Sequence, residues 1–525
     1  MTTYFNTGYF KYAMEDSPES IYSPQRQDVT IKYLYIKNCY FSALEEKSDV
    51  CESIYEKHIY ERTGGYEPDG SKKSIDEYKQ EFDNLIKSIS NRGYTGDPIP
   101  FSTETRLILD GAHRLACCLY FDEEPKLKPV DDEKGLTWDY EWFVENGFTQ
   151  AELNTIVKTY CEIVDYEVAS FLLWSPAKKE WDEIENYIDN SLDVLMTRNF
   201  SFAEENFSAV VNDIYSYESG IEPGSNIDEK VGDVIEYGPE FRLILATDFT
   251  TNTNSSLWEK AQQIKQEMRS RYDDISQETN HDYTILHCTD EPAHSKHVIT
   301  TLLNENNLRM LSLRKSDNLR PQFREWLEEY RRALDDEGLD VENTCIVGSS
   351  VLEILAIRKS TDIDFIVDED TRYAKFDSGA TSLSENVDLG NSGYHKTTNE
   401  TDEISDNEVI YNTHHHFRYR GLKFAAPNIV RDSKTAVARE KDIKDVHLMD
   451  EYLSTLDANQ RQAHGWDLPA WKIKVLTLTP RWDLMVRKKI SRAKSHAFGW
   501  AGRNLPEPVK NFLKKVYLTG CQLSG

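Results

Sequence analysis

The 525-residue sequence lacks paired cysteines. None of its eight cysteines forms a CxxC motif, which argues against a zinc ribbon or a thioredoxin-type redox site. In proteins of reducing compartments, such cysteines usually remain free thiols and are buried as small apolar side chains. The cysteine pattern therefore predicts a cytoplasmic protein.

Long apolar runs are also absent. The longest uncharged apolar run covers residues 168–174, far short of the ~18 residues that predict a membrane-spanning helix. The first residues do not combine a basic segment with an apolar one, so we expect no secretory signal. Hydrophobic residues nevertheless make up 39% of the chain, which predicts folded domains rather than general disorder.

Positive charge is scarce and unevenly placed. The chain has 61 Lys and Arg against 91 Asp and Glu, a net charge of -30. Residues 471–515 contain twelve basic and only two acidic residues, so they carry +10 and residues 1–470 carry -40. The acidic excess counts against nucleic acid as the main partner. The basic segment, which interleaves aromatic residues, suits an anionic membrane surface at the inner face, nucleic acid, or the acidic remainder of the chain.

Length and patterning predict a mixed α/β and α+β multidomain chain, since roughly 100–200 residues form one domain. We expect an N-terminal domain over 1–150, a central α/β domain over 151–310, a third domain over 311–460 and a basic helical tail over 461–525. Apolar spacing predicts helices over 75–89 and 321–338, and strands over 106–109, 241–249, 282–288, 345–348 and 362–367. A stretch rich in Ser, Thr, Asn and Gly over 377–407 predicts a long loop.

The strongest chemical motif lies in the third domain. An apolar strand ends in Gly348-Ser349-Ser350, a helix-like segment follows, and the next strand carries Asp362 and Asp364. Because side chains alternate along a strand, both carboxylates share one face, where they can hold one or two divalent metals. Gly348 allows close backbone approach, and the amides that follow can contact phosphate. These are the parts that nucleotidyl transfer requires.

This pattern resembles the signature of the polymerase-β-like nucleotidyltransferase superfamily over residues 311–460. The resemblance implies that Asp362 and Asp364 hold Mg²⁺ or Mn²⁺ and that the Gly348-Ser349-Ser350 segment positions a nucleoside triphosphate. The competing interpretation is a domain that keeps this fold without the catalysis.

The superfamily usually has a third carboxylate on a later strand. Glu408 is the candidate third metal ligand, and Asp388 is the alternative. Downstream, Lys423, Arg439 and Lys441 are candidate charge partners for the phosphates.

A second motif, Asp110-Gly111-Ala112-His113-Arg114, follows a predicted strand and opens a helix. It resembles the DGxHR element of the ParB/sulfiredoxin-like fold, over about residues 60–125 of the N-terminal domain. The resemblance implies that Asp110 is an acid-base or metal residue and that Gly111, His113 and Arg114 bind nucleotide phosphates. The simpler interpretation is a helix capped by Asp110.

Histidines form a third cluster, His287, His294 and His297, around Asp290. A helix capped by Thr289-Asp290 and followed by surface histidines accounts for this cluster better than a metal site does. The position of His287 and Asp290 after a predicted strand is nonetheless typical of ligand sites in α/β folds.

The order of these motifs resembles that of large enzymes encoded among genes for cell-surface polysaccharides and glycans. The sequence therefore predicts a metal-dependent nucleotidyl- or phosphotransferase that uses an NTP and a small-molecule or sugar-phosphate acceptor. Two alternatives stay open: a ParB-like nucleic-acid-binding regulator with a degenerate transferase domain, and a toxin or defence-type nucleotidyltransferase.

Overall fold

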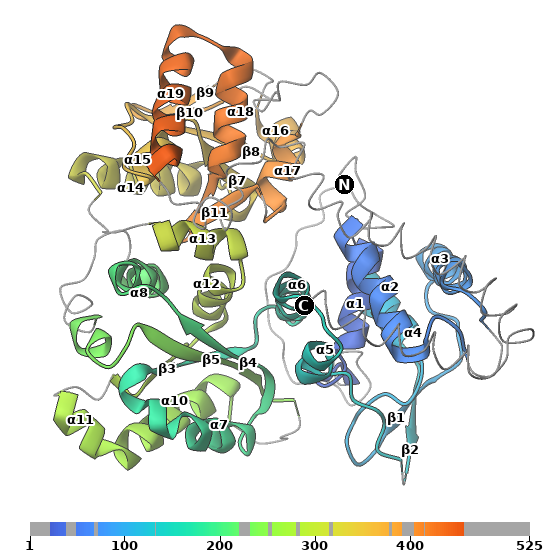
Figure 1. The fold of residues 1–525 in the computed structure, drawn as a ribbon. Coiled ribbons are helices and arrows are strands. Elements are labelled where there is room, and N and C mark those ends of the chain that lie inside the picture. Colours follow the sequence, from blue (N-terminus) through green and yellow to red (C-terminus); the bar gives the residue numbers. More distant parts are fainter. Residues whose placement is uncertain are drawn as a thin grey trace, which may run out of the picture. The chain divides into compact units, whose positions relative to one another are not determined.

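The computed structural model describes most of the first 455 residues. The described ranges are 21–37, 49–67, 72–131, 133–219, 231–249, 255–279, 284–313, 319–376, 381–390, 404–413 and 415–455. The predicted basic tail and the central loop over 220–230 lie outside them. Within the described part, the chain is a mixed α/β protein with three separate sheets, in agreement with the predicted class (Figure 1).

The N-terminal part is mainly helical. Its elements are α1 (Gln27–Tyr35), α2 (Asp49–Thr63), α3 (Ile75–Arg92), β1 (Ile99–Ser102), α4 (Ala112–Phe121), β2 (Leu127–Val130), α5 (Tyr140–Glu145) and α6 (Gln150–Ile163). Helix α1 packs against α2, α4 and α6, and nearly all of its residues are buried. Helix α3 covers the predicted 75–89, with Ser74 as its N-cap.

The strand predicted over 106–109 is wrong. The two-stranded parallel sheet is formed by β1 and β2 instead, and Ile108 makes only an isolated bridge to Phe101. Arg106 has a φ of 59°, a left-handed conformation that an extended strand cannot contain. The chain therefore turns back at this point before it reaches Asp110.

The central part is built on a four-stranded antiparallel sheet with the order β4-β5-β3-β6. Its elements are β3 (Ala169–Trp174), the 3-10 helix η3 (Ser175–Glu180), α7 (Trp181–Asp189), β4 (Asp193–Ser201), α8 (Glu204–Ser219), β5 (Glu240–Thr247), α10 (Leu257–Arg271), α11 (Asp273–Thr279), β6 (Leu286–Cys288), α12 (Pro292–Leu302) and α13 (Glu305–Leu313). This order is the βαββαβ arrangement of a ferredoxin-like sheet, with α8 inserted between the second and third strands.

Both faces of the central sheet are covered. Phe171 and Leu173 point into a core shared with α7 and α10, whereas Leu172 and Trp174 point into a core that extends to the N-terminal helices. Strands that are buried on both faces have continuous apolar runs in the sequence. Such runs allowed strands to be predicted over 241–249 and 282–288.

The third part is a six-stranded mixed sheet with the order β11-β12-β7-β8-β10-β9. Its elements are α14 (Pro321–Glu337), the 3-10 helix η5 (Val341–Asn343), β7 (Thr344–Val347), α15 (Ser349–Ile354), β8 (Ile363–Val367), α16 (Glu369–Lys375), β9 (Thr381–Ser384), β10 (Val387–Leu389), α17 (Asp406–Tyr411), β11 (His416–Tyr419), β12 (Leu422–Ala425), α18 (Pro427–Val437) and α19 (Glu440–Thr455). Its core is a separate apolar cluster. The strands and helix predicted around the Gly348 and Asp364 motifs are confirmed.

The loop predicted over 377–407 is partly wrong. Strands β9 and β10 pair antiparallel within it, and α17 begins at its end. The composition suggested a loop because this hairpin is short and its strands carry Ser and Thr.

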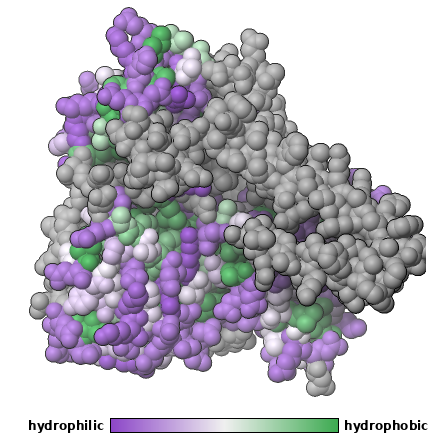
Figure 2. Space-filling view, in the orientation of Figure 1, coloured by the Kyte–Doolittle hydropathy of each residue, from purple (hydrophilic) through white to green (hydrophobic). Residues whose placement is uncertain are grey.

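Hydrophilic side chains cover most of the described surface on the face drawn in Figure 2, and apolar ones form small separate groups. Across the described residues, no helix combines the length and the apolar character that crossing a membrane would require.

Candidate functional site

The register of the third sheet places three carboxyl groups together. Asp364 on β8 is paired across to Val347 on one side and to Asp388 on the other, in parallel with β10. Residues paired across parallel strands direct their side chains to the same face of the sheet. Asp362 immediately precedes β8, two residues from Asp364. The carboxylates predicted from the motif are therefore joined by Asp388.

Electrostatics supports this grouping. Burial, followed by the negative charges of Asp362 and Asp388, raises the pKa of Asp364 to about 6. Lys441 and Lys434 act in the opposite direction but do not offset the carboxylates. Like charges that are held together without a compensating cation produce this kind of shift.

Glu408, the predicted third ligand, has a different position. Its carboxylate accepts a hydrogen bond from the Ser405 backbone N–H at 2.8 Å, and its own N–H donates to Ser405 Oγ, which completes a capping box at the start of α17. The pattern of a Ser followed three residues later by Glu is the sequence signature of this cap. Asp388, the alternative third ligand, lies instead on β10, a strand within the stretch that the composition predicted to be a loop.

The Gly348-Ser349-Ser350 segment is held against the Asp362 loop. Ser350 Oγ donates to the Asp362 carbonyl at 3.0 Å, and Ser360 Oγ donates to the same carbonyl at 2.6 Å. Ser349 Oγ lies 2.7 Å from Ser360 Oγ. Since the Ser360 proton goes to Asp362, the Ser349 hydroxyl donates to Ser360. These bonds fix the backbone that carries Asp362.

Gly348 is the N-cap of α15 and has a φ of 68°. This left-handed conformation favours glycine, so the motif glycine is required by the turn between β7 and α15.

Basic side chains near the carboxylates come from α18 and α19, which pack side by side (Figure 1). Lys434 is buried and forms an ion pair of 2.7 Å with Asp445. Lys441 is exposed, and its charge lowers the pKa of Asp364 more than that of Lys434 does. Arg439 is engaged with Asp442. Of the three predicted phosphate partners, Lys441 is thus the one whose charge acts on the carboxylates.

Lys423 lies elsewhere on the sheet. It is buried on β12 and paired by register with Arg418, and its ammonium donates to the Glu342 carbonyl. Strand β12 is two strands from β8, and Lys423 faces the Cys345 end of β7 rather than the Val347 end. The structure does not bring Lys423 to the three carboxylates.

The three carboxylates fit a divalent cation in charge and in ligand type, because oxygen ligands are those that Mg²⁺ prefers. The raised pKa of Asp364 shows that the group repels itself as it stands. Among the described residues, no three His, Cys, Asp or Glu side chains converge closely enough to form a complete metal site. Asp362, Asp364 and Asp388 are neighbours by strand register but do not form a closed ligand set.

The residues of the Asp110–Arg114 motif lie in two different environments. Asp110 is largely exposed and pairs with Arg114 at 3.0 Å, and Arg114 also donates to the Asp97 carbonyl. His113 instead lies 2.9 Å from the Tyr55 hydroxyl and packs edge-on against Phe82. Burial, with nearby cations, lowers the pKa of His113 well below its usual value. Asp110 and Arg114 are brought together, whereas a neutral His113 holds α4 against α2 and α3.

The backbone conformation at position 111 explains why this residue is a glycine. Its φ is 90°, and a Cβ added there would lie 2.8 Å from the Arg114 guanidinium. The close approach of Arg114 to the Asp110 carboxylate therefore requires a glycine between them.

A buried ionic cluster behind this motif was not predicted. Asp28 accepts from Arg26 at 2.8 Å and from Lys32 at 3.0 Å, and all three side chains are buried. Arg26 also donates to the Ile108 carbonyl, next to the motif. Although burial alone would raise it, the two cations hold the pKa of Asp28 far below its usual range. This cluster could not be expected from the residue pattern, because charged residues on a helix predict an exposed face.

The histidines of the central part are buried rather than on the surface, contrary to the prediction. His294 Nδ1 lies 2.9 Å from Asp290 Oδ1, and its ring stacks on Tyr217. His287 contacts the His294 ring at a centroid distance of 5.3 Å. His297 Nε2 lies 2.7 Å from the Asp213 carbonyl oxygen.

The predicted cap of this helix is also wrong. Helix α12 begins after Glu291, and no side chain caps it. The histidines are buried because α12 packs against β3 and α8.

Comparison with known proteins found no match: no family model, no curated protein and no solved structure resembles the chain closely enough to be recognised.

Proposed function

We propose that the third domain is a nucleotidyltransferase-like domain that catalyses metal-dependent nucleotidyl or phosphoryl transfer from an NTP. The observation that carries the proposal is the parallel pairing of Asp364 with Asp388, with Asp362 two residues from Asp364 and the pKa of Asp364 raised to about 6. The third acid of the superfamily signature is then Asp388.

Each group has a role in this proposal. The three carboxylates would hold Mg²⁺ or Mn²⁺, which supplies charge neutralisation of the triphosphate and polarisation of the attacking oxygen. Gly348 and the amides after it would position the triphosphate, while Ser349, Ser350 and Ser360 keep the Asp362 backbone fixed. Lys441 is the exposed cation available to a phosphate oxygen.

The acceptor class, a small molecule or sugar phosphate of surface-glycan synthesis, is supported by the order of motifs along the chain. For the N-terminal domain we propose a ParB/sulfiredoxin-like module whose second phosphate site uses Asp110, Gly111 and Arg114. The neutral, aromatic surroundings of His113 favour a structural role for that residue over phosphate binding.

The test is the double variant Asp362→Asn plus Asp364→Asn in the full chain. We expect NTP consumption and pyrophosphate or phosphate release, measured with Mg²⁺ and a pool of sugar phosphates, to fall by on the order of a hundredfold or more. Glu385→Gln is the matched control, since Glu385 is an exposed acid in the turn just before Asp388. Equal rates in the double variant and the wild type would refute the proposal.

A further inference from the structure

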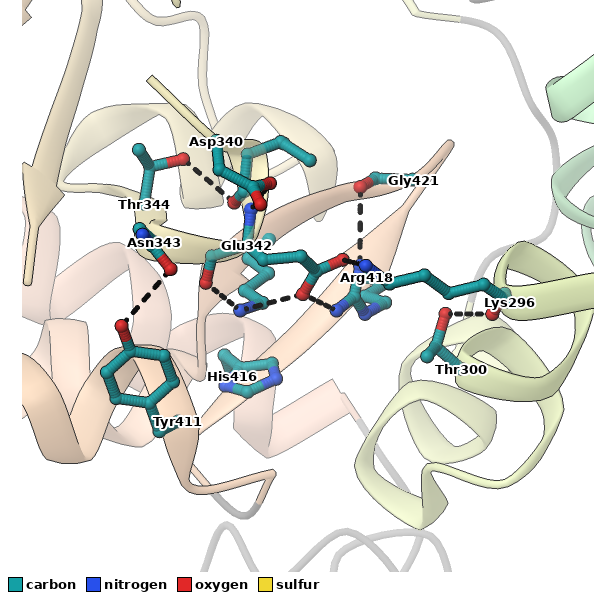
Figure 3. A network of polar contacts seen from close by, with 12 residues as sticks. Lys296, Thr300, Asp340, Glu342, Asn343, Thr344, Tyr411, His416, Arg418 and Gly421 are labelled. Carbon is teal, nitrogen blue, oxygen red and sulfur yellow. Dashed lines mark hydrogen bonds and ion pairs between the residues drawn. The ribbon is translucent and has the colours of Figure 1, made fainter. Parts of the chain in front are cut away.

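Cations outnumber acids at the edge of the third sheet that β11 forms. Four side chains form the group that we call the Glu342 cluster: Lys296 from α12, Glu342 from η5, Arg418 from β11 and Lys423 from β12. Figure 3 shows Lys296, Glu342 and Arg418. Arg418 Nη2 donates to Glu342 Oε2 at 2.6 Å, Lys423 Nζ lies 3.1 Å from the same oxygen, and Lys296 Nζ lies 3.6 Å from Oε1. Three cations thus share one carboxylate.

The neighbouring charges do not remove this surplus. Glu162 on α6 is paired with both Lys37, at 3.1 Å, and Lys158, at 3.7 Å. Asp213 on α8 accepts the backbone N–H of Arg420. With Asp213, whose charge acts on Arg418, the Glu342 cluster and the Glu162 group have five cations and three carboxylates, in a chain whose overall charge is -30.

Burial makes the surplus unfavourable. The Arg418 and Lys423 side chains are 7% and 4% exposed, and a buried cation needs a nearby negative charge. Burial and the charge of Arg418 lower the pKa of Lys423 to about 8, although Glu342 opposes that change. Glu342, with a smaller contribution from Asp213, raises the pKa of Arg418 against the effect of burial. Lys423 is therefore the cation whose charge is not fully compensated.

The cluster is also accessible. Glu342 and Lys296 are 24% and 37% exposed, so two members of the cluster reach the solvent. Arg and Lys donors converging from separate elements are the groups that bind phosphate.

We propose that the Glu342 cluster binds a phosphate group of a small molecule, with Arg418, Lys423 and Lys296 as its donors. This site is distinct from the three carboxylates and does not depend on the transferase proposal. It joins α12 of the central part to the strands of the third sheet, so its occupancy would link the two.

The test is calorimetric titration of the full chain with inorganic phosphate, without divalent metal and against chloride at equal ionic strength. Lys423→Met should weaken phosphate binding about tenfold, because one charge-assisted donor is lost. Glu342→Gln should strengthen binding several-fold, because a competing carboxylate is removed. Lys87→Met, at an exposed position of α3, should bind as the wild type does.

The opposite signs of the two variants distinguish a phosphate site from a purely structural ion cluster. The proposal is overturned if the wild type binds phosphate no better than chloride, or if Glu342→Gln does not bind more tightly. The variant Asp362→Asn plus Asp364→Asn should retain wild-type phosphate affinity, so that this result is independent of whether transfer occurs.

Discussion

Asp388 on β10 lies directly beside Asp364 on β8, in parallel register, and its negative charge contributes to the raised pKa of Asp364. The two residues are 24 positions apart in the sequence, and the pairing of short strands brings them together. This relationship turns a two-residue motif into a group of three acids, and it has consequences for stability and for metal binding.

The first prediction concerns Asp364 and pH. Its folded-state pKa of about 6 exceeds the unfolded value of 3.8, so the folded chain holds more protons between these values and its stability falls as pH rises through that window. At pH 7.5, Asp364→Asn should raise the free energy of unfolding by about 1 kcal/mol, a value reduced for partial exposure. Chemical denaturation at pH 4 and pH 7.5 measures this difference; an equal effect at both values would contradict it.

Divalent cations should act on the same residue. Mg²⁺ or Mn²⁺ in the millimolar range should raise the melting temperature of the wild type, since an ion that binds only the folded state stabilises it. Asp364→Asn should lose most of this increase, whereas Glu385→Gln should keep it. Thermal denaturation with and without the ion provides the measurement, and an equal increase in Asp364→Asn would rule out ion binding at this residue.

Ser360 is predicted to hold the backbone of Asp362. Its buried hydroxyl donates to the Asp362 carbonyl and accepts from Ser349, so Ser360→Ala should cost about 1–2 kcal/mol of unfolding free energy. Ser382→Ala, which removes an exposed hydroxyl bonded within the β9–β10 turn, should cost little. Urea unfolding of the two variants tests the difference, and equal costs would show that the Ser360 bonds contribute nothing.

Gly111 should tolerate a side chain less well than Gly147 does. Gly111→Ala combines a strained φ of 90° with a Cβ placed 2.8 Å from Arg114, while Gly147→Ala has a φ of 71° and meets no atom within 4 Å. We expect Gly147→Ala to cost about 1 kcal/mol and Gly111→Ala about 2–3 kcal/mol. The comparison of the two unfolding free energies isolates the steric effect; if both variants lose the same amount, Arg114 has moved aside freely.

His58 should make the fold sensitive to acid. It is fully buried beside Trp142 and Phe143, and neither ring nitrogen has a hydrogen-bond partner among the described residues. Burial, followed by the charge of Lys32, lowers its pKa well below 6.5, so the folded state excludes a proton that the unfolded state binds. Stability is then lost as pH falls below 6.5, by about 1.4 kcal/mol per pH unit for each such proton.

The matching variant is His58→Phe, which fits the aromatic surroundings. Between pH 6.5 and 5, the unfolding free energy of this variant should fall less steeply with decreasing pH than that of the wild type. The difference in slope should correspond to the uptake of one proton. Other buried histidines, such as His416, will keep part of the slope. A slope identical to that of the wild type would mean that His58 is already protonated in the folded chain.

The sequence was sufficient to predict the elements whose patterns are local. The apolar strands around Gly348 and Asp364 and the amphipathic helix α14 follow directly from residue spacing, and they are where they were expected. The carboxylates Asp362 and Asp364 could be predicted for the same reason, since both belong to one short segment.

Features that depend on pairing between distant segments could not be predicted. The choice of Asp388 over Glu408 required the register of β8 with β10, and the Asp28 cluster required α1 to be buried by three other helices. For Glu408 the local pattern was sufficient. The sequence contains the capping box of Ser405 and Glu408, and this pattern predicts a helix cap rather than the metal ligand that we expected. Lys423 looked like a phosphate ligand of the carboxylate site because sequence order does not reveal which edge of a sheet a strand occupies.

The most direct measurement is Mg²⁺-dependent product release by Asp388→Asn and Glu408→Gln, assayed side by side with the wild type. The account predicts that Asp388→Asn loses on the order of a hundredfold in rate, while Glu408→Gln stays within about twofold and loses only about 1 kcal/mol of stability from its cap. A rate lost in Glu408→Gln and kept in Asp388→Asn would contradict the three-carboxylate site.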